Sequence, residues 1–468
     1  MRAKNNSTLD VAAKPAKQGE LVSIFVPDDH PLLQLKGALD WKAVQEVMVK
    51  PWRAAGKNVD GGRGQEWPVG LSVPLVVLTF VKGYHSRQSE EDVEESVVAR
   101  RFCGLSRQSE LHIRDHASIA RAIQALGAEG VAEVHQVVMG KARELGFPSG
   151  EILSSDTPVQ EPKIGSPHEP GILKGLAQRC ERALKKLKQR GGKLAQEGIK
   201  TTQEIDRKVK HHHRVAKTTE ERREILRQIV EQTEKLMWQS EQVIQQVGER
   251  ATGVKQSAQA KLQEMGEVAR QWLPQIKDWM EKGKVAANQI LHAGLKEARA
   301  MVSDQAGRKV RFGFNWLIHR FQGGSLAGRR VKPQASESEM PIESLKDDRA
   351  MFGAKARPKI QIDDRGGRST QTVEKLTQAG IKKLGLPPRG PEEWLVGEKE
   401  QKRVNSERGK TEGSIGRWKS KQYGFSGRQE RSLETQTAAG QKAIVSANLN
   451  TLMRDLVRQE RAAGEQCC

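Results

Sequence analysis

Cysteine is scarce in this sequence, with four residues among 468, at positions 103, 180, 467 and 468. Their number and spacing exclude a disulfide framework and lack the paired arrangement of a zinc site. The adjacent pair Cys467-Cys468 is interpreted as an exposed tail and not as a redox centre. The scarcity of cysteine therefore indicates a protein of a reducing compartment.

Long apolar segments are also missing. The longest run, residues 71–81, is interrupted by Ser72, Pro74 and Thr79. It is too short to cross a bilayer and predicts a buried helix. The first twenty residues are polar and basic and lack the apolar segment of a signal peptide. We therefore expect a cytoplasmic protein with no membrane partner.

Acidic residues are outnumbered, with 58 Asp and Glu against 79 Lys and Arg and a formal net charge of +21. Only 36% of the residues are hydrophobic, which is fewer than in an average globular protein. The length predicts two or three domains in a partly elongated molecule. The positive charge indicates a polyanionic partner, with nucleic acid the leading candidate. A ribosome-associated or merely soluble basic protein is the alternative.

The amino-terminal third of the sequence is predicted to be helical, after a disordered tail at residues 1–30. Apolar residues recur at helical spacing, and Gly-rich turns separate the segments. We expect an all-helical domain over residues 31–150. Its predicted helices are residues 33–52, 74–84, 91–102, 118–126 and 131–145.

Residues 172–303 form a predicted helical insertion, because they are nearly free of proline and rich in Ala, Glu, Lys, Gln and Leu. Apolar residues at intervals of three and four predict three or four long helices in a hairpin or coiled-coil arrangement. Gly191-Gly192 and Thr218, a good cap before acidic residues, mark predicted breaks. The insertion could cover DNA, bridge two protomers or pack back on the rest of the protein.

The remaining segments, residues 151–171 and 304–460, carry strand patterns and predict an α/β domain with a mixed sheet flanked by helices. Apolar and polar residues alternate from residue 310, and Gly323-Gly324 precedes a second strand, which predicts a hairpin. Residues 461–468 are expected to be a frayed tail. The other predicted elements are strands at 358–364 and 381–386 and helices at 340–352, 370–380, around 412 and at 435–460.

Three acidic residues of this region, Asp156, Asp364 and Glu412, each close a predicted strand or lie in a predicted helix. Arg408 lies four residues before Glu412, and Lys419 lies seven residues after it. At about 100° per residue, these three side chains fall within about 40° of one another on one helical face. Three carboxylates suit two Mg²⁺ or Mn²⁺ ions, which clamp the attacking and leaving oxygens in phosphodiester chemistry. The pattern predicts a two-metal nuclease site, with Arg408 and Lys419 offering charge to DNA phosphates.

Each acid also has an ordinary structural interpretation. Asp156 before Thr-Pro and Asp364 before Arg-Gly-Gly suit turns, and Glu412 suits an exposed ion pair with the arginine four residues earlier. Asp363 and Glu407 are nearby acids that compete for the metal-binding roles. The nuclease interpretation therefore depends on the three acids taken together.

The spacing Arg408-x3-Glu412-x6-Lys419 resembles the signature of DDE insertion-sequence transposases with a ribonuclease-H-like catalytic domain, most closely the group called ISNCY. Asn405 stands where that signature usually has a tyrosine. The resemblance covers residues 30–175 and 305–460. The other matching segments are Ser155-Asp156-Thr157, Gln160-Glu161-Pro162, Gly313-Phe314, Trp316-Leu317, Asp364-Arg365-Gly366-Gly367, and Gln441 through Asn450 to Arg454-Asp455-Leu456.

The resemblance implies a ribonuclease-H-like catalytic domain over residues 151–171 and 304–460, interrupted by the insertion. It implies that Asp156, Asp364 and Glu412 are the catalytic residues and hold two Mg²⁺ ions. Cleavage at a transposon end would free a 3′-hydroxyl, which would then attack target DNA. The helical amino-terminal domain of such enzymes binds the element's terminal repeats or helps dimerise the protein, and a scaffold that packs on the catalytic core is the alternative.

The partners implied are double-stranded DNA, both as terminal inverted repeats and as target, and further copies of the chain. A homodimer or higher oligomer would hold two ends in a synaptic complex, associated with the bacterial nucleoid. Two alternatives remain, a nuclease of the same fold without strand transfer and a catalytically inactive DNA-binding derivative. The residues expected to contact DNA are Arg408, Lys419, Arg365, Arg368, Arg329 and Arg330.

Overall fold

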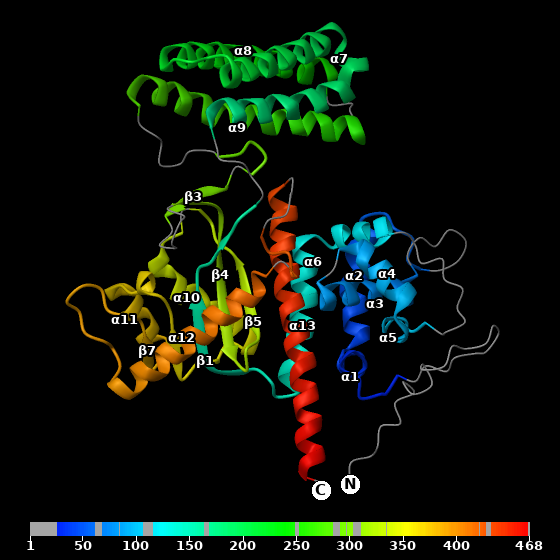
Figure 1. Ribbon diagram of the computed structural model, residues 1–468, viewed down its shortest axis with the longest axis vertical. Helices are drawn as coiled ribbons and strands as arrows, with labels where there is room; N and C mark the ends of the chain where they lie inside the picture. Colours follow the sequence, from blue (N-terminus) through cyan, green and yellow to red (C-terminus); the bar gives the residue numbers. More distant parts are fainter. Residues whose placement is uncertain are drawn as a thin grey trace, which may run out of the picture.

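The computed structural model contains a mixed β-sheet and three groups of helices (Figure 1). One group comes from the amino-terminal part of the chain, a second covers the two faces of the sheet, and a third forms a separate lobe. Most of the predicted tail at residues 1–30, and the pair Cys467-Cys468, lie outside the residues that the structure describes. Those described are 26–60, 68–83, 85–105, 116–162, 168–248, 252–283, 291–295, 297–302, 310–333, 335–420, 422–426 and 432–466.

In the described part of the chain, six helices precede the sheet. The predicted helix over residues 33–52 is two helices, because the side chain of Asp40 accepts the Ala43 amide at 3.0 Å and starts a new one. The break predicted at Gly127 between two helices is present, because Gly127 has a non-helical backbone with φ 64° and divides α6 (His116–Glu144) into two helical stretches at a kink. The six helices are α1 (Pro31–Ala38), α2 (Trp41–Ala54), α3 (Val69–Lys82), α4 (Ser86–Glu95), α5 (Val97–Phe102) and α6 (His116–Glu144).

The core of these helices is completed by the last helix of the chain, α13 (Leu433–Gln466). Val445, Leu449 and Leu452 of α13 are buried in the same apolar cluster as residues of α2, α3 and α6. Figure 1 shows α13 running between the amino-terminal helices and the sheet. The sequence predicted this helix but placed it with the catalytic segments alone, and predicted a frayed tail where α13 continues to Gln466.

The sheet is mixed, and β1 lies at its centre. Strand β4 runs antiparallel to both β1 and β5, whereas β6 is parallel to β1 and β7 is parallel to β6. The short strands β2 and β3 pair with the first part of β4. The strands are β1 (Ser149–Asp156), β2 (Val159–Gln160), β3 (Arg299–Val302), β4 (Val310–Gln322), β5 (Leu326–Arg330), β6 (Ile360–Ile362) and β7 (Lys383–Gly385).

Helices cover both faces of the sheet. On one face, Ile152 and Ile362 pack with Val404 of α12 (Glu398–Trp418), and Trp316 packs with Trp418 and α13. On the other face lie α10 (Met340–Phe352) and α11 (Thr370–Gln378). Because both faces are buried, polar residues of the strands also lie inside the protein.

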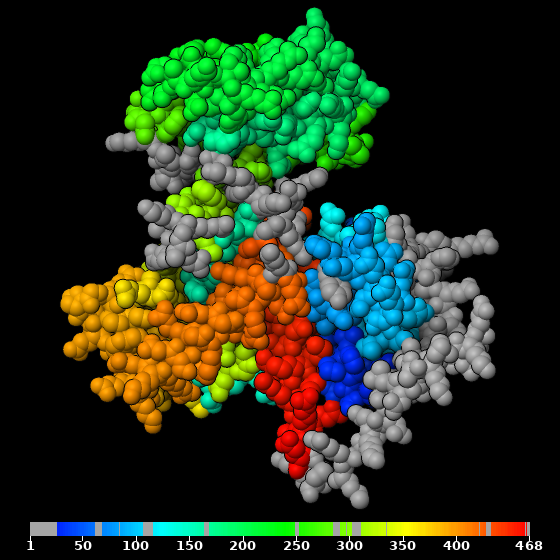
Figure 2. All heavy atoms as spheres, in the orientation of Figure 1, coloured from blue at the N-terminus to red at the C-terminus, as the bar shows by residue number. Residues whose placement is uncertain are grey.

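The insertion consists of three long helices, α7 (Glu169–Arg214), α8 (Thr219–Val247) and α9 (Val254–Lys282). They share an apolar core of their own and form a lobe above the sheet in the space-filling view (Figure 2). The predicted breaks are present: Gly192 has φ 52° within α7, and Thr218 caps α8. The Glu221 side chain accepts the Thr218 amide in return, which completes a capping box.

Within the described residues, no single helix is long and apolar enough to cross a membrane. Helices α3 and α4 together have the length and composition of a membrane span, but the two helices are bent by 106° relative to each other.

Candidate active site

Asp156, Asp364 and Glu412 line one cavity of about 630 Å³, although 208 and then 48 positions separate them in the sequence. Arg408 and Lys419 line the same cavity. Asp156 ends β1, Asp364 follows the neighbouring parallel strand β6, and Glu412 lies on α12 above them. The structure thus brings five of the predicted site residues together.

The register of the strands explains why Asp156 and Asp364 share a face. Ser154 of β1 pairs with Ile362 of β6, and the two acids each lie two residues further on. Because side chains alternate along a strand, both acids belong to the face that α12 covers. Thr411 Oγ1 donates a hydrogen bond of 2.8 Å to Ser154 Oγ, and this buried contact fixes Glu412 beside Asp156.

Burial and like charges act on Asp156. Its pKa is raised, mainly by burial and further by the charges of Asp364 and Glu412. The Thr157 amide, which donates to Asp156 Oδ1 at 2.7 Å, and the charge of Lys419 act in the opposite direction. A cation placed in the cavity would relieve this repulsion.

The other two acids are more exposed. Asp364 Oδ1 accepts hydrogen bonds from the Arg365 amide at 2.6 Å and from Arg408 Nη2 at 3.0 Å. The Glu412 carboxylate makes no hydrogen bond or ion pair within the described residues. Gly409, Gly413 and Gly416 of α12 have open space where a Cβ would stand, so bare helix surface adjoins this edge of the cavity.

The two competing acids lie elsewhere. Asp363 points to the opposite face of the sheet, where its Oδ1 lies close to Gly367, and burial raises its pKa well above the usual value. Glu407 is buried in ion pairs with Arg320 at 2.9 Å and Lys410 at 2.7 Å. Neither lines the cavity, so the geometry favours Asp364 and Glu412 for the site.

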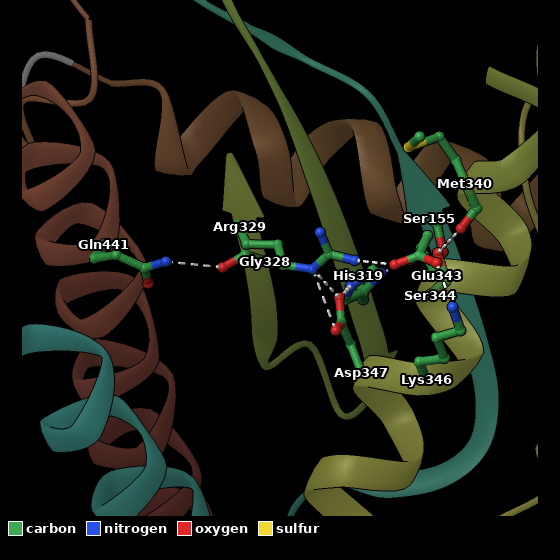
Figure 3. A network of polar contacts seen from close by, with 10 residues as sticks. All are labelled: Ser155, His319, Gly328, Arg329, Met340, Glu343, Ser344, Lys346, Asp347 and Gln441. Atoms are coloured by element: carbon green, nitrogen blue, oxygen red, sulfur yellow. Dashed lines mark hydrogen bonds and ion pairs between the residues drawn. The ribbon is translucent and has the colours of Figure 1, made fainter. Parts of the chain in front are cut away.

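Beneath the site, the opposite face of β1 contacts a partly buried polar network (Figure 3). The ring of His319 on β4 lies 3.5 Å from Ser155 Oγ and 2.8 Å from Asp347 Oδ2 on α10. Arg329 of β5 joins Asp347 at 3.1 Å and Glu343 at 2.6 Å. The network fixes the strand position next to Asp156. The alternation pattern had placed His319 on the polar side of a hairpin, but it is fully buried because α10 covers that face.

The four other predicted DNA-contacting arginines do not line the cavity. Arg368 is buried and pairs with Glu392 at 2.7 Å, away from the cavity lining. Arg329 belongs to the network beneath the sheet, and Arg330 pairs with Glu297. Arg365 is exposed, but its side chain lies outside the cavity lining.

One of the positively charged residues that line the cavity was not predicted from the sequence. Arg311, the second residue of β4, lines the cavity and lies 2.9 Å, from its Nε, from Glu161 Oε1. The alternation of Arg311 with apolar neighbours marked it only as a polar strand position. Its place at the site follows from the pairing of β2 with β4, which the sequence pattern does not specify.

The three carboxylates fit hard divalent cations in donor type. In the described part of the chain, however, no group of three or more His, Cys, Asp or Glu side chains is arranged to hold a metal ion. The hydrogen bonds of Asp156 and Asp364 use one oxygen of each carboxylate: the Thr157 amide donates to Asp156 Oδ1, and the Arg365 amide and Arg408 donate to Asp364 Oδ1.

Comparison with known proteins supports a transposase family. A family model described as Transposase domain (DUF772) matches residues 21–125, which include helices α1 to α5. The match ends before β1 and does not include the cavity residues. No curated protein matches the chain, and no solved structure does.

Proposed function

We propose that this protein is a DDE transposase that cleaves DNA at transposon ends and joins the freed 3′-hydroxyl to target DNA. The observation that carries the proposal is the convergence of Asp156, Asp364 and Glu412 on one cavity that also contains Arg408 and Lys419. The transposase-domain match at residues 21–125 supports the same class of protein. The strand order, with two parallel strands beside an antiparallel group of three, supports a ribonuclease-H-like catalytic domain.

In this proposal, Asp156, Asp364 and Glu412 hold two Mg²⁺ or Mn²⁺ ions. Bound there, the ions would supply Lewis-acid stabilisation of the attacking and leaving oxygens. Arg408 neutralises Asp364 before DNA binds and then turns its fork to a phosphate. Lys419 contributes a point charge from the end of α12. The partners are double-stranded DNA and a second copy of the chain that holds the other end.

The first test is cleavage of plasmid DNA with Mg²⁺ or Mn²⁺ by the full chain and by Glu412→Gln. We expect the variant to lose about a thousandfold in cleavage rate, equivalent to about 4 kcal/mol of barrier, because a carboxylate ligand is lost. DNA binding, measured without metal, should be retained. Glu398→Gln is the matched control, since Glu398 is an exposed acid on the same helix outside the cavity.

The same assay separates the alternatives. Cleavage without joining of a pre-cut end to target DNA would identify a nuclease that lacks strand transfer. DNA binding without cleavage, unchanged in Glu412→Gln, would identify an inactive derivative and refute the proposed function.

A further inference from the structure

Two cavity cations lie close enough to repel each other. Arg311 and Lys419 both line the cavity, from β4 and from the end of α12. Burial, and then the charge of Arg311, lower the pKa of the Lys419 amine, against the opposing charges of Asp156 and Glu161. Two neighbouring cations in a partly buried site are stabilised by a bound anion.

Among the residues that the structure describes, Lys419 has no direct counterion. Its ammonium group makes no hydrogen bond or ion pair with any described residue. Its nearest carboxylates act on it only through space. A half-buried, unpaired ammonium that faces a cavity is therefore available to an anion that enters the cavity.

Arg311 is only partly satisfied. Its Nε pairs with Glu161 Oε1 at 2.9 Å, and the two side chains are 18% and 26% exposed. Within the described residues its terminal guanidinium nitrogens make no hydrogen bond. Glu161 follows β2 directly, and its own amide donates to Ser426 Oγ at 3.2 Å. The Gln160-Glu161 segment thus places one carboxylate against the cavity arginine.

We propose that Arg311 and Lys419 form a phosphate subsite for the DNA group next to the one held at Asp156, and that Glu161 holds Arg311 until this phosphate replaces it. The inference rests on the proposed function, because that function supplies DNA as the source of the anion. A guanidinium fork and an ammonium group together provide charge-assisted hydrogen bonds to one phosphate. Glu161 competes with the phosphate for the same arginine.

The proposal predicts opposite effects from the two partners of one ion pair. Binding of a fluorescent duplex of about 30 base pairs is measured by anisotropy in EDTA, where cleavage cannot occur. Arg311→Gln should bind about tenfold more weakly, with the salt dependence of binding reduced by about one phosphate. Glu161→Gln should bind several-fold more tightly, because the competing carboxylate is gone. Arg311→Lys should restore part of the lost affinity.

A merely structural ion pair would give a different result, since both substitutions would then weaken binding together or leave it unchanged. Either outcome would overturn the proposal. Lys383→Gln and Glu400→Gln are the matched controls, because these residues form a strand-to-α12 ion pair outside the cavity. Both should bind like the parent protein. Should Arg311→Gln fail to fold, the tighter binding expected of Glu161→Gln still tests the subsite.

The binding assay tests the phosphate subsite and the cleavage assay tests the proposed function, so one proposal can be refuted without the other. Opposite shifts in affinity together with no metal-dependent cleavage would preserve the phosphate subsite and remove the proposed transposase activity. Unchanged affinities in a chain that cleaves DNA would remove the subsite alone.

Discussion

Asp347 and Asp348 are neighbours on α10 but lie in opposite electrostatic environments. Burial raises the pKa of Asp347, but its bonds to His319 and Arg329 outweigh burial and lower it overall. Asp348 is buried with neither oxygen hydrogen-bonded within the described residues, and burial raises its pKa to about 7. Asp347 therefore stabilises the folded protein when ionised, whereas Asp348 destabilises it when ionised.

We predict that Asp348→Asn removes a pH-dependent loss of stability. The Asp348 carboxyl group ionises near pH 4 in the unfolded chain and near pH 7 in the folded protein. The stability that the protonated carboxyl group gives the folded protein is therefore lost as pH rises from about 4 to about 7. Urea unfolding measures the effect. Between pH 5 and pH 8, the free energy of unfolding of the parent protein should fall by about 2 to 3 kcal/mol more than that of Asp348→Asn. Asp347→Asn should instead lose stability relative to the parent above pH 4. Equal pH dependence in parent and Asp348→Asn would contradict the prediction.

Individual site residues could be predicted where the chemistry shows in local spacing. Arg408 and Glu412 lie on α12, Lys419 is the C-cap residue of that helix, and all three line the cavity. The choice of Asp364 over Asp363 needed strand register to support it, because adjacent residues face opposite sides of a sheet. Arg311 could not be predicted, since its place depends on strand pairing across the insertion.

At the scale of elements, α13 packs against the sheet through a glycine. A Cβ on Gly440 would lie 2.0 Å from Cζ2 of Trp316, which is fully buried on β4. Further along α13, Asn448 Oδ1 accepts the Leu326 amide at 2.8 Å, and its Nδ2 lies 2.7 Å from the ring Nε2 of His135 on α6. The Gln441 to Leu456 segment of α13 therefore connects this helix to α6 and β5, which gives the matching segment a structural role.

We predict that Gly440→Ala destabilises the protein by about 1 to 3 kcal/mol, because the added methyl group overpacks the contact with Trp316. Thermal unfolding followed by near-ultraviolet circular dichroism measures the effect. The matched control is Gly140→Ala on α6, where a Cβ meets nothing within 4 Å. That change should be neutral or stabilising by up to about 1 kcal/mol. A Gly440→Ala variant as stable as the parent would show that α13 can shift away from the sheet.

Most elements could be predicted because their signals are local. The helix Met340–Phe352 was predicted to the residue, and the hairpin of β4 and β5 followed from alternation and two glycines. Boundaries were missed where a single polar residue acts as a cap, as Asp40 does between α1 and α2. Short strands such as β2 and β3 were missed because two to four residues carry too little pattern.

At the scale of the whole molecule, the insertion is a self-contained lobe. Its apolar core is separate from the clusters around the sheet. The strands on either side of it return to adjacent positions, since Gln160 of β2 pairs with Phe314 and Arg299 of β3 pairs with Gly313. The chain therefore leaves the sheet and returns to it at nearly the same place.

We predict that replacing residues 169–283 by a flexible linker of about ten residues leaves the rest of the protein folded, because the linker need only join neighbouring positions. The variant should keep the near-ultraviolet signal of Trp316 and Trp418 and a single cooperative thermal transition. Its helical signal should fall by the content of α7, α8 and α9. Loss of cooperative unfolding would show that the lobe stabilises the sheet.

The dual packing of α13 has a consequence for biosynthesis. The amino-terminal helices emerge from the ribosome long before α13, so their core lacks Val445, Leu449 and Leu452 until α13 has been translated. A nascent chain that does not yet contain α13 therefore cannot complete the amino-terminal core or the Trp316 cluster of the sheet. Folding of both parts of the molecule is thereby coupled to the synthesis of one late helix.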